Sequence, residues 1–458
     1  MRTAFTQRIY LPLLDRARAT PFRKALHELR SNEKLPLEKL QELQVQQLRS
    51  LLAHAREHSP FHAERMRVAG LEPQDVTDIS CLRALPVLEK NTLYDHYDNV
   101  RSRQYPGKKF SGSTSGSTGI ALRFEYDSIH DAVITAAMWR HRGWWGLRRG
   151  DREAELWGRP LKISEIQKRI QSTKYWLRNI RHFYTFGDFD EAQMESMVKG
   201  LRKFRPKLVY GYGSSLARLA RFMTEKGERL EGQSRPILVE FTADHMHAAE
   251  QAIAEEAFGC PVASQYGASE TPSIAGQCPQ GGMHIAIDQC ILEFVRADGT
   301  AAGPGEHADL VVTPLYNFAM PLIRYRVGDA GAYSDDKCPC GLTLPLMNLT
   351  IGKSIELITT STAAGVSAHI LDYANLLLLR KQIPGLRQFF IEQTDLDRFR
   401  LDYVSDGAPA RPALASFIAT MREHLGEQIA VECRSVSEIP APASGKRRYF
   451  KNSCAKTS

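Results

Sequence analysis

The sequence predicts an α/β protein with more than one domain. A large N-terminal part is expected to hold helix-covered mixed and parallel sheets with a β-rich subdomain, followed by a small α+β part. The chain has 458 residues, enough for more than one hydrophobic core. Strand-like apolar runs alternate with helical runs between 190 and 267, as in a sheet covered by helices. The pattern turns β-rich from 283 to 333 and restarts after 353, so we place the domains at 1–351 and 352–458.

Composition and charge are those of a globular protein without a membrane-spanning helix. Hydrophobic residues make up 43% and charged residues 24%, and no apolar run approaches the roughly twenty residues of a membrane helix. The first residues lack the apolar core of a secretory signal, so we expect a cytoplasmic protein with no stable membrane insertion. The net charge of +8 favours anionic ligands, but it is not concentrated in a tail, so nucleic acid is not an expected partner.

The N-terminal elements are predicted to be helical. Residues 1–70 carry apolar side chains at three- and four-residue spacing, most clearly from Leu35 to Ala55. Residues 85–90 predict a short extended segment, and residues 128–147 a helix ending in the basic, aromatic run from Trp139 to Gly146. We expect these tryptophans to pack inside the protein, and contact with a membrane or nucleic acid is the alternative.

Helices and strands alternate farther along the chain. Helices are predicted at 191–204, 216–226 and 247–258, and strands at 207–212, 236–242 and 261–267. Four more strands are predicted at 285–287, 291–295, 309–313 and 323–325.

The run from Ser111 to Gly119 consists only of glycine, serine and threonine. Its glycines permit backbone turns with positive φ, and its successive N–H groups and hydroxyls can surround an anion. Strand-like residues flank it on both sides, which predicts a loop between two strands. Phosphate binding is the favoured interpretation and a flexible linker is the alternative. The run has neither the ending of a Walker loop nor the spacing of a dinucleotide fingerprint.

Two carboxylates follow predicted strands. Glu270 closes the segment Tyr-Gly-Ala-Ser-Glu, at the strand end where α/β sheets place ligand chemistry and where a carboxylate can hold Mg²⁺. Asp329 closes Arg-Tyr-Arg-Val-Gly-Asp, after a strand and a glycine turn, where it could accept two hydrogen bonds from a ribose. Arg324 and Arg326 lie two residues apart and are predicted to share one strand face. A surface glutamate and a hairpin with surface arginines are the alternatives.

Four residues form a candidate metal site. Cys278 and His284 occur in Cys-Pro-Gln-Gly-Gly-Met-His, and Cys338 and Cys340 in Cys-Pro-Cys-Gly. Three thiolates and one imidazole complete a tetrahedral zinc set with no open position for water, which predicts structural rather than catalytic zinc. Because cytosolic thiols are usually reduced, a metal is favoured over disulfides, and unrelated free cysteines are the alternative.

Lys446 follows Ser-Gly near the end of the chain. On a turn of this kind its ammonium group could reach a ligand as a point charge. From these residues alone, a plain basic surface run of Lys-Arg-Arg is the preferred interpretation.

The order of these motifs resembles the adenylate-forming (ANL) superfamily, and within it the phenylacetate–CoA ligase branch with its CapK-type members. The matching pieces are the Gly/Ser/Thr loop, Tyr-Gly-x-Ser-Glu, Arg-Tyr-Arg-x-Gly-Asp, the small C-terminal unit and Ser-Gly-Lys. Gly211-Tyr-Gly-Ser-Ser215 and the two Cys-Pro segments match that branch as well. The resemblance covers nearly the whole chain. It implies ATP and Mg²⁺ beside the structural Zn²⁺ predicted from the four ligands, with coenzyme A as one of two candidate acceptors and an amine as the other.

The resemblance also implies a role for each motif. Glu270 is expected to meet Mg²⁺, and Lys446 to contact the reacting carboxylate and the α-phosphate; both are the expected catalytic residues. Residues 352–356 would be the hinge of a mobile C-terminal domain. The residues expected to bind ATP are Ser111, Ser113, Thr114, Ser115, Gly116, Ser117, Thr118, Gly119, Ala243, Asp244, Tyr266, Gly267, Ser269, Arg326 and, at the ribose, Asp329. The acid pocket is expected at Tyr210, Tyr212, Gly213 and Ser214, whose rings suit a flat acid and equally suit core packing.

The sequence departs from the family pattern at three places. Ile120-Ala121 follows the loop where many relatives carry a lysine or small residue and then proline. Ala243-Asp244 replaces Gly-Glu, and the hinge reads Gly352-Lys-Ser-Ile-Glu356 in place of Gly-Arg with paired aspartates. We therefore expect a divergent member with an unusual acceptor.

The expected reaction is activation of a carboxylic acid by ATP to an acyl-adenylate, with release of pyrophosphate. Transfer to coenzyme A would then give a thioester, and transfer to an amine would give an amide. Loop N–H groups, Mg²⁺ and Lys446 would stabilise the charge that grows on the phosphate oxygens. Such an enzyme would serve surface polysaccharide or secondary metabolite biosynthesis, as a monomer or homodimer. Two alternatives stay open: adenylyl transfer onto a substrate hydroxyl, and a catalytically silent, zinc-stabilised binding module.

Overall fold

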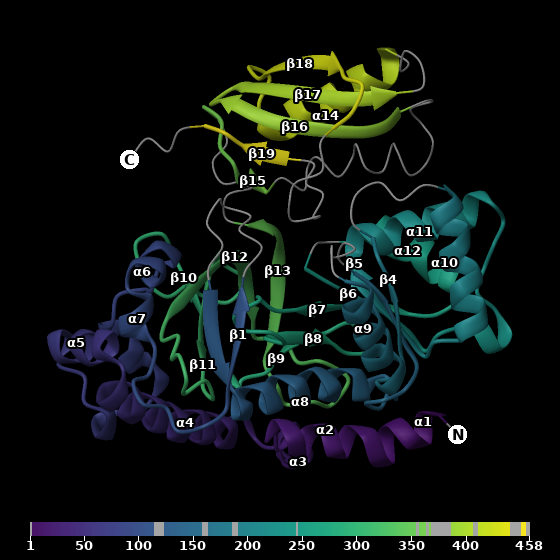
Figure 1. Cartoon of the computed structure of the whole chain (residues 1–458). Helices are drawn as coiled ribbons and strands as arrows, with labels where there is room; N and C mark the ends of the chain where they lie inside the picture. The colour runs from purple at the N-terminus through teal and green to yellow at the C-terminus, as the bar shows by residue number, and fades with distance from the viewer. Residues whose placement is uncertain are drawn as a thin grey trace.

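A mixed eleven-stranded sheet runs through the centre of the molecule (Figure 1). The computed structural model describes residues 2–113, 123–157, 164–185, 191–243, 246–353, 357–362, 366–367, 386–405, 411–439 and 450–454. The strand order is β10-β11-β12-β13-β9-β8-β7-β6-β5-β3-β4. The expected α/β architecture with a mixed sheet is therefore confirmed.

One half of the sheet is parallel and the other antiparallel. The parallel strands are β3 (Glu153–Leu156), β4 (Ile180–Phe183), β5 (Leu208–Tyr212), β6 (Leu238–Thr242) and β7 (Val262–Tyr266). The antiparallel strands are β8 (Ala275–Gln277), β9 (Met283–Ile285), β10 (Cys290–Val295), β11 (Ala308–Pro314), β12 (Tyr325–Ser334) and β13 (Leu346–Lys353). Strand β7 is the last strand of the parallel half, and in open α/β sheets ligands bind outside the carboxyl ends of the parallel strands.

Helices cover both faces of the parallel half. On one face lie α10 (Glu191–Phe204), α11 (Gly213–Glu225) and α12 (Ala248–Phe258), and on the other α3 (Phe22–Asn32) and α8 (Ser128–Trp144). Because side chains alternate along a strand, β5 sends Val209 into the first core and Leu208 and Tyr210 into the second. The alternation of predicted helices and strands from 191 to 267 is confirmed.

Helix α8 begins where Asp127 caps it. One carboxylate oxygen of Asp127 accepts from the N–H groups of Ile129 and His130, both at 2.9 Å, which satisfies two donors of the first turn. At the other end Trp139 is buried, and Trp145 donates from Nε1 to the Gln277 carbonyl at 2.9 Å. The tryptophans at this helix end pack inside the protein, as predicted.

The N-terminal segment is helical, as predicted. Its elements are α1 (Arg2–Phe5), a π-helical segment (Thr6–Tyr10), α2 (Leu11–Arg18), α4 (Leu37–His58), α5 (Pro60–Ala69), α6 (Lys90–Asp95) and α7 (Tyr97–Val100). Short 3₁₀ turns lie at Pro73–Asp75, Ile79–Ala84 and Gly232–Ser234, and α9 (Glu165–Leu177) follows β3. No helix in the described ranges is both long and apolar enough to cross a lipid bilayer.

A separate small α+β region forms the C-terminal part and lies at the top of Figure 1. Its sheet has the order β18-β17-β16-β19, from β16 (Leu386–Asp395), β17 (Arg398–Ser405), β18 (Ala430–Ser435) and β19 (Phe450–Asn452). Helix α14 (Arg411–Leu425) packs on it through a core of its own that includes Phe417 and Met421. The short pair β14 (Leu357–Ile358) and β15 (Val366–Ser367) precedes it.

Strand β12 differs from the sequence prediction at both of its ends. Strand β12 begins at Tyr325, because Arg324 has a φ of 57°, and it continues through Asp329 to Ser334. The two arginines therefore do not share a strand face, and Asp329 lies inside a strand rather than after one. Gly328, with a φ of 83°, supplies the irregularity that sequence reasoning took for a turn.

Candidate active site

Two buried tyrosines hold the two carboxylates that the motifs single out. The Tyr325 hydroxyl donates to Oε1 of Glu270 at 2.8 Å, and the Tyr266 hydroxyl donates to Oδ2 of Asp329 at 3.2 Å. Three strands separate β7 from β12 in the sheet, so the sheet must curve enough to bring these side chains together. The structure thus unites residues from two motifs that lie far apart in the sequence.

Both tyrosines stay protonated and donate hydrogen bonds to their carboxylates. Burial, followed by the charge of Asp329, raises the pKa of Tyr266 well above its usual value. Burial and then the charge of Glu270 raise the pKa of Tyr325 in the same way. The carboxylates therefore provide the negative charge of this site and the tyrosines orient it.

The turn between β7 and β8 is built for close backbone approach. A Cβ atom at Gly267 would lie 2.6 Å from the backbone nitrogen of Ser273, so no other residue fits there. Ser273 itself has a φ of 61°. The Thr271 hydroxyl beside Glu270 is buried and has no hydrogen-bond partner in the described ranges, which marks a place for a polar ligand. Sequence reasoning missed Thr271, and Ser269 is exposed on the same turn.

Ala243 directly follows the neighbouring strand β6 and has a φ of 71°, in the region that favours glycine. This is the position where the sequence carries Ala-Asp in place of Gly-Glu, so the backbone keeps a glycine-type conformation without glycine. Such strain occurs at functional sites when surrounding structure enforces it. Asp244 lies outside the described residues.

The Gly/Ser loop lies between two paired strands. Strand β1 (Lys109–Ser113) pairs antiparallel with β2 (Arg123–Asp127). Ser111 and Ser113 therefore lie on β1, the first strand of this hairpin. This confirms the predicted strand-loop-strand setting. The predicted phosphate-binding residues from 114 to 119, the lysine at 446 and the hinge residues 354–356 lie outside the described residues.

The two arginines beside Asp329 have structural partners. Arg324 is buried, forms an ion pair with Glu293 at 2.9 Å and donates to the Leu85 carbonyl at 2.6 Å. Arg326 donates from Nε to Glu89 at 2.8 Å and also pairs with Asp309. These two carboxylates engage its guanidinium, and the predicted role of Arg326 at the nucleotide stays a prediction.

The predicted acid pocket contains an aromatic stack. Trp157 lies 3.9 Å from Tyr212, centroid to centroid and nearly parallel, and 5.6 Å from Tyr210. Gly213 and Ser214 start α11 directly after Tyr212. Sequence reasoning missed Trp157, which comes from the end of another strand, so only the sheet order brings it here.

Beneath the stack lies a buried charge network that the motifs did not reveal. Arg142 donates from Nε to Glu240 at 2.7 Å and from Nη1 to Glu153 at 3.2 Å, and its guanidinium lies 4.8 Å from the Tyr210 ring. Burial lowers the pKa of Arg142, but the two carboxylates outweigh burial and raise it. Glu153 shares Arg142 with Glu240, so the arginine offsets only part of the effect of burial. Burial therefore raises the pKa of Glu153 to about 7.

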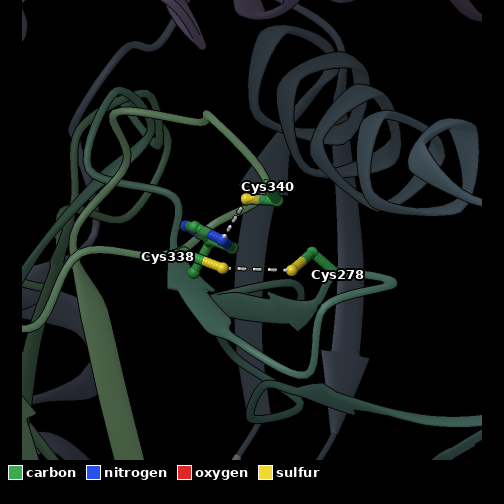
Figure 2. Close-up of side chains that lie close together, drawn as sticks. Cys278, Cys338 and Cys340 are labelled. Atoms are coloured by element: carbon green, nitrogen blue, oxygen red, sulfur yellow. Dashed lines mark hydrogen bonds between the residues drawn. The ribbon is translucent and has the colours of Figure 1, made fainter.

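The four predicted metal ligands come together beside the β8–β9 hairpin of the antiparallel half. The ligand atoms of Cys278, His284, Cys338 and Cys340 all lie within 4.8 Å of one another. Figure 2 shows Cys278 and Cys338 pointing toward each other, with 3.5 Å between their sulfur atoms. His284 Nδ1 donates to the Leu344 carbonyl at 2.8 Å, so the ring presents Nε2 to the other ligands, 3.2 Å from Cys340 Sγ. All eight cysteines are free thiols, so no disulfide competes for these ligands.

Comparisons with known proteins agree with this architecture. No protein-family model matches the chain. Protein CapK of Staphylococcus aureus is 21% identical over 421 residues, which cover 90% of this chain and 89% of CapK. A phenylacetate–coenzyme A ligase of Thermus thermophilus is 26% identical over 333 residues, covering 71% of this chain and 73% of that protein.

A crystal structure of a 2-hydroxyisobutyryl-CoA ligase in its postadenylation state matches with a TM-score of 0.70 and 19% identity. The match covers 92% of this chain and 91% of that one, so it shows the same fold. Fold and sequence relatives together define the class, which is that of the adenylate-forming ligases. Within that superfamily, the curated sequences to which the chain is similar are CapK and phenylacetate–coenzyme A ligases.

Proposed function

We propose that this enzyme activates a carboxylic acid with ATP and passes the acyl group to a thiol or an amine. The observation that carries the proposal is the pairing of Glu270 with Tyr325 and of Asp329 with Tyr266 beside the carboxyl end of β7. A carboxylate oxygen of the acid attacks the α-phosphorus of ATP, and the α–β phosphoanhydride bond breaks to release pyrophosphate. The acceptor then attacks the acyl carbon, and AMP leaves.

Asp329 is proposed to bind the ribose diol and Glu270 to hold Mg²⁺. Magnesium prefers carboxylate and other oxygen ligands, and Glu270 has one oxygen that accepts no hydrogen bond in the described ranges. The Thr271 hydroxyl adds an unused oxygen next to it. When bound, Mg²⁺ would neutralise charge on the phosphate oxygens. The Gly/Ser loop and Lys446 are proposed to hold the phosphates and to stabilise the charge of the transition state.

The acyl group is proposed to lie near the stack of Trp157 and Tyr212. Their flat faces offer apolar area at the carboxyl ends of β3 and β5, beside the strands that carry the nucleotide residues. This favours a flat or ring-containing acid. Residues 352–458 are proposed to form the domain that brings Lys446 to the site and then turns to admit the acceptor.

We also propose that Cys278, His284, Cys338 and Cys340 bind a structural zinc ion. Zinc takes thiolates at about 2.3 Å and imidazole at about 2.0–2.1 Å, and the four ligand atoms are close enough to meet one ion after a small contraction. The site ties the β8–β9 hairpin to the segment before β13. Zinc there would stabilise the fold without touching the acid or the nucleotide.

Metal analysis is expected to find about one zinc per chain, bound tetrahedrally. Cys338→Ser should lose the metal and lower the thermal unfolding midpoint, because metal binding free energy contributes to folding. Cys433→Ser, a cysteine outside the cluster, is the matched control and should keep both. Wild-type protein that is metal-free and unchanged by a strong chelator would refute the zinc site.

Hydroxylamine trapping over a panel of carboxylic acids tests the proposed function. An acid that supports ATP-dependent hydroxamate formation identifies the substrate, and repeating the assay with coenzyme A or with amines identifies the acceptor. Adenylylation of a hydroxyl compound without any hydroxamate would favour the adenylyltransferase alternative. Absence of both reactions, with ATP still bound, would favour the silent binding module.

A further inference from the structure

The first helical stretch carries an exposed apolar stripe. Phe5, Ile9 and Leu13 follow one another at four-residue intervals along α1, the π-helical segment and α2, and they are 39%, 50% and 61% exposed. Helical spacing places them along one side of the stretch. Thr6 and Leu11 of the same stretch are buried against the protein. The stretch therefore packs part of its surface on the protein and leaves the three apolar side chains in solvent.

The solvent-facing side of the same stretch is basic. Arg8 and Arg16 are exposed beside the stripe, and within the described ranges neither pairs with a carboxylate. The single acidic residue of the stretch, Asp15, is engaged by Arg149 at 2.7 and 2.9 Å. The free charge around the stripe is therefore positive.

An exposed tryptophan adjoins the beginning of the same helical stretch. The Arg2 side chain donates to the Trp176 carbonyl at 2.7 Å, and its guanidinium lies 5.0 Å from the Trp176 ring, which is 53% exposed. Thr6 donates to the Leu177 carbonyl at 3.0 Å, so the end of α9 is fixed to the N-terminal helix. We use the name N-terminal face for the side chains of Phe5, Ile9, Leu13 and Trp176 together with Arg8 and Arg16.

This chemistry fits an anionic lipid surface better than a protein partner. Interfacial helices place Phe, Leu and Trp at the acyl boundary and Lys or Arg at the headgroups. Stable protein interfaces bury about 800 Å² on each partner, more than a narrow stripe with one tryptophan offers. Figure 1 shows the N-terminal helices at the bottom of the molecule and the small C-terminal region at the top. Contact with a surface below would thus leave that region uncovered.

We propose that the N-terminal face binds reversibly to the surface of a bilayer that contains anionic lipid. The apolar stripe enters the boundary between headgroups and acyl chains, and Arg8 and Arg16 contact lipid phosphates. Neither part alone suffices, since a few apolar side chains or a few charges give only marginal membrane binding. This goes beyond the proposed ligase reaction and does not depend on it.

Vesicle flotation of the full chain tests the proposal. Wild-type protein should float with vesicles of phosphatidylcholine and phosphatidylglycerol, and should bind vesicles of phosphatidylcholine alone far less. Raised salt should weaken the binding, because it screens the arginines. Combining Phe5→Ser, Ile9→Ser and Leu13→Ser should lower vesicle affinity about tenfold or more, and combining Arg8→Gln with Arg16→Gln about tenfold.

Matched controls separate this face from general surface effects. Val68→Ser, Ile237→Ser and Leu396→Ser remove three other exposed apolar side chains, and Arg103→Gln with Lys203→Gln removes two other exposed charges. Both control variants should bind vesicles like the wild type, and all variants should keep the wild-type unfolding midpoint.

Three results would overturn the proposal. The first is a wild-type chain that binds neither kind of vesicle. The second is equal loss of binding in the stripe variant and its control. The third is a dimer in sedimentation velocity that the stripe variant dissociates while vesicle binding is absent, which would assign the face to a second copy of the chain.

Discussion

The two ends of the sheet's ligand-binding edge are built differently. At one end, which we propose binds the nucleotide and call the nucleotide end, Glu270 follows β7 and Asp329 lies on β12, and each carboxylate accepts a hydrogen bond from a neutral tyrosine. At the other end, which we propose binds the acyl group and call the acyl end, β3 and β5 bring together stacked aromatic rings over a buried arginine shared by two glutamates. The first end offers charge to a polar ligand, whereas the second neutralises its charge internally and offers apolar faces. This difference fits the proposal that one sheet binds a nucleotide and an acyl group side by side.

The largest effect is expected from breaking the buried network at the acyl end. Arg142→Met would leave Glu153 and Glu240 without their cation, and should lower the free energy of unfolding by about 3–5 kcal/mol. Arg202→Met removes an arginine whose pair with Glu228 is largely exposed, and should cost less than about 1 kcal/mol. Urea unfolding of the two variants measures both. Equal small losses would mean that the network does not hold the acyl end.

The second effect should separate the two ends by substrate. Asp329→Ala should raise the KM for ATP roughly 30-fold, because a ribose diol would lose hydrogen bonds to a charged acceptor, and should leave the KM for the acid nearly unchanged. Tyr212→Leu should do the reverse, because it removes one ring of the stack. Steady-state kinetics with the acid found by trapping measures both. If Asp329→Ala raised the KM for the acid more than the KM for ATP, the assignment of Asp329 to the ribose would be wrong.

The smallest effect concerns pH and the acyl end. The pKa of Glu153 is raised from 4.5 to about 7, so between these values the folded chain holds a proton that the unfolded chain has lost. Stability from this group is therefore fully present below pH 4.5 and falls as pH rises through about 7. Glu153→Gln should remove that fall.

Urea unfolding of wild type and Glu153→Gln at about pH 5 and about pH 8 checks this. The difference between the two proteins should change by on the order of 1–2 kcal/mol over that range, in favour of the variant at the higher pH. Glu306→Gln, at an exposed carboxylate, is the control and should show no such gain on raising the pH. A constant difference for Glu153→Gln would contradict the raised pKa.

The same contrast explains how far the sequence could be interpreted. Glu270 and Asp329 close short motifs directly after or within strands, so local spacing was enough to single them out. Tyr266 is near Glu270 in the sequence but donates to Asp329, and Tyr325 is near Asp329 but donates to Glu270. Only the curved sheet brings each tyrosine to its carboxylate. Strand β12 was misplaced because a non-glycine residue, Arg324, takes a left-handed conformation that its buried contacts enforce.

The acyl end was largely invisible in the sequence. Arg142, Glu153 and Glu240 come from a helix and two strands with no shared motif, and Trp157 meets Tyr212 only because β3 and β5 are neighbours. The four metal ligands were predictable because cysteine and histidine are rare and their glycine- and proline-rich settings were distinctive. Rare residue types in local patterns can be identified from sequence, whereas networks formed through sheet order require the fold.

Carboxylate-dependent exchange of pyrophosphate into ATP tests the central claim most directly. With the correct acid and Mg²⁺, the wild-type enzyme should catalyse exchange in the absence of any acceptor, because adenylate formation precedes transfer. Glu270→Gln and Lys446→Ala should each reduce exchange strongly. A wild-type enzyme that uses the acid and ATP to make a product, yet shows no exchange without the acceptor, would contradict the acyl-adenylate mechanism.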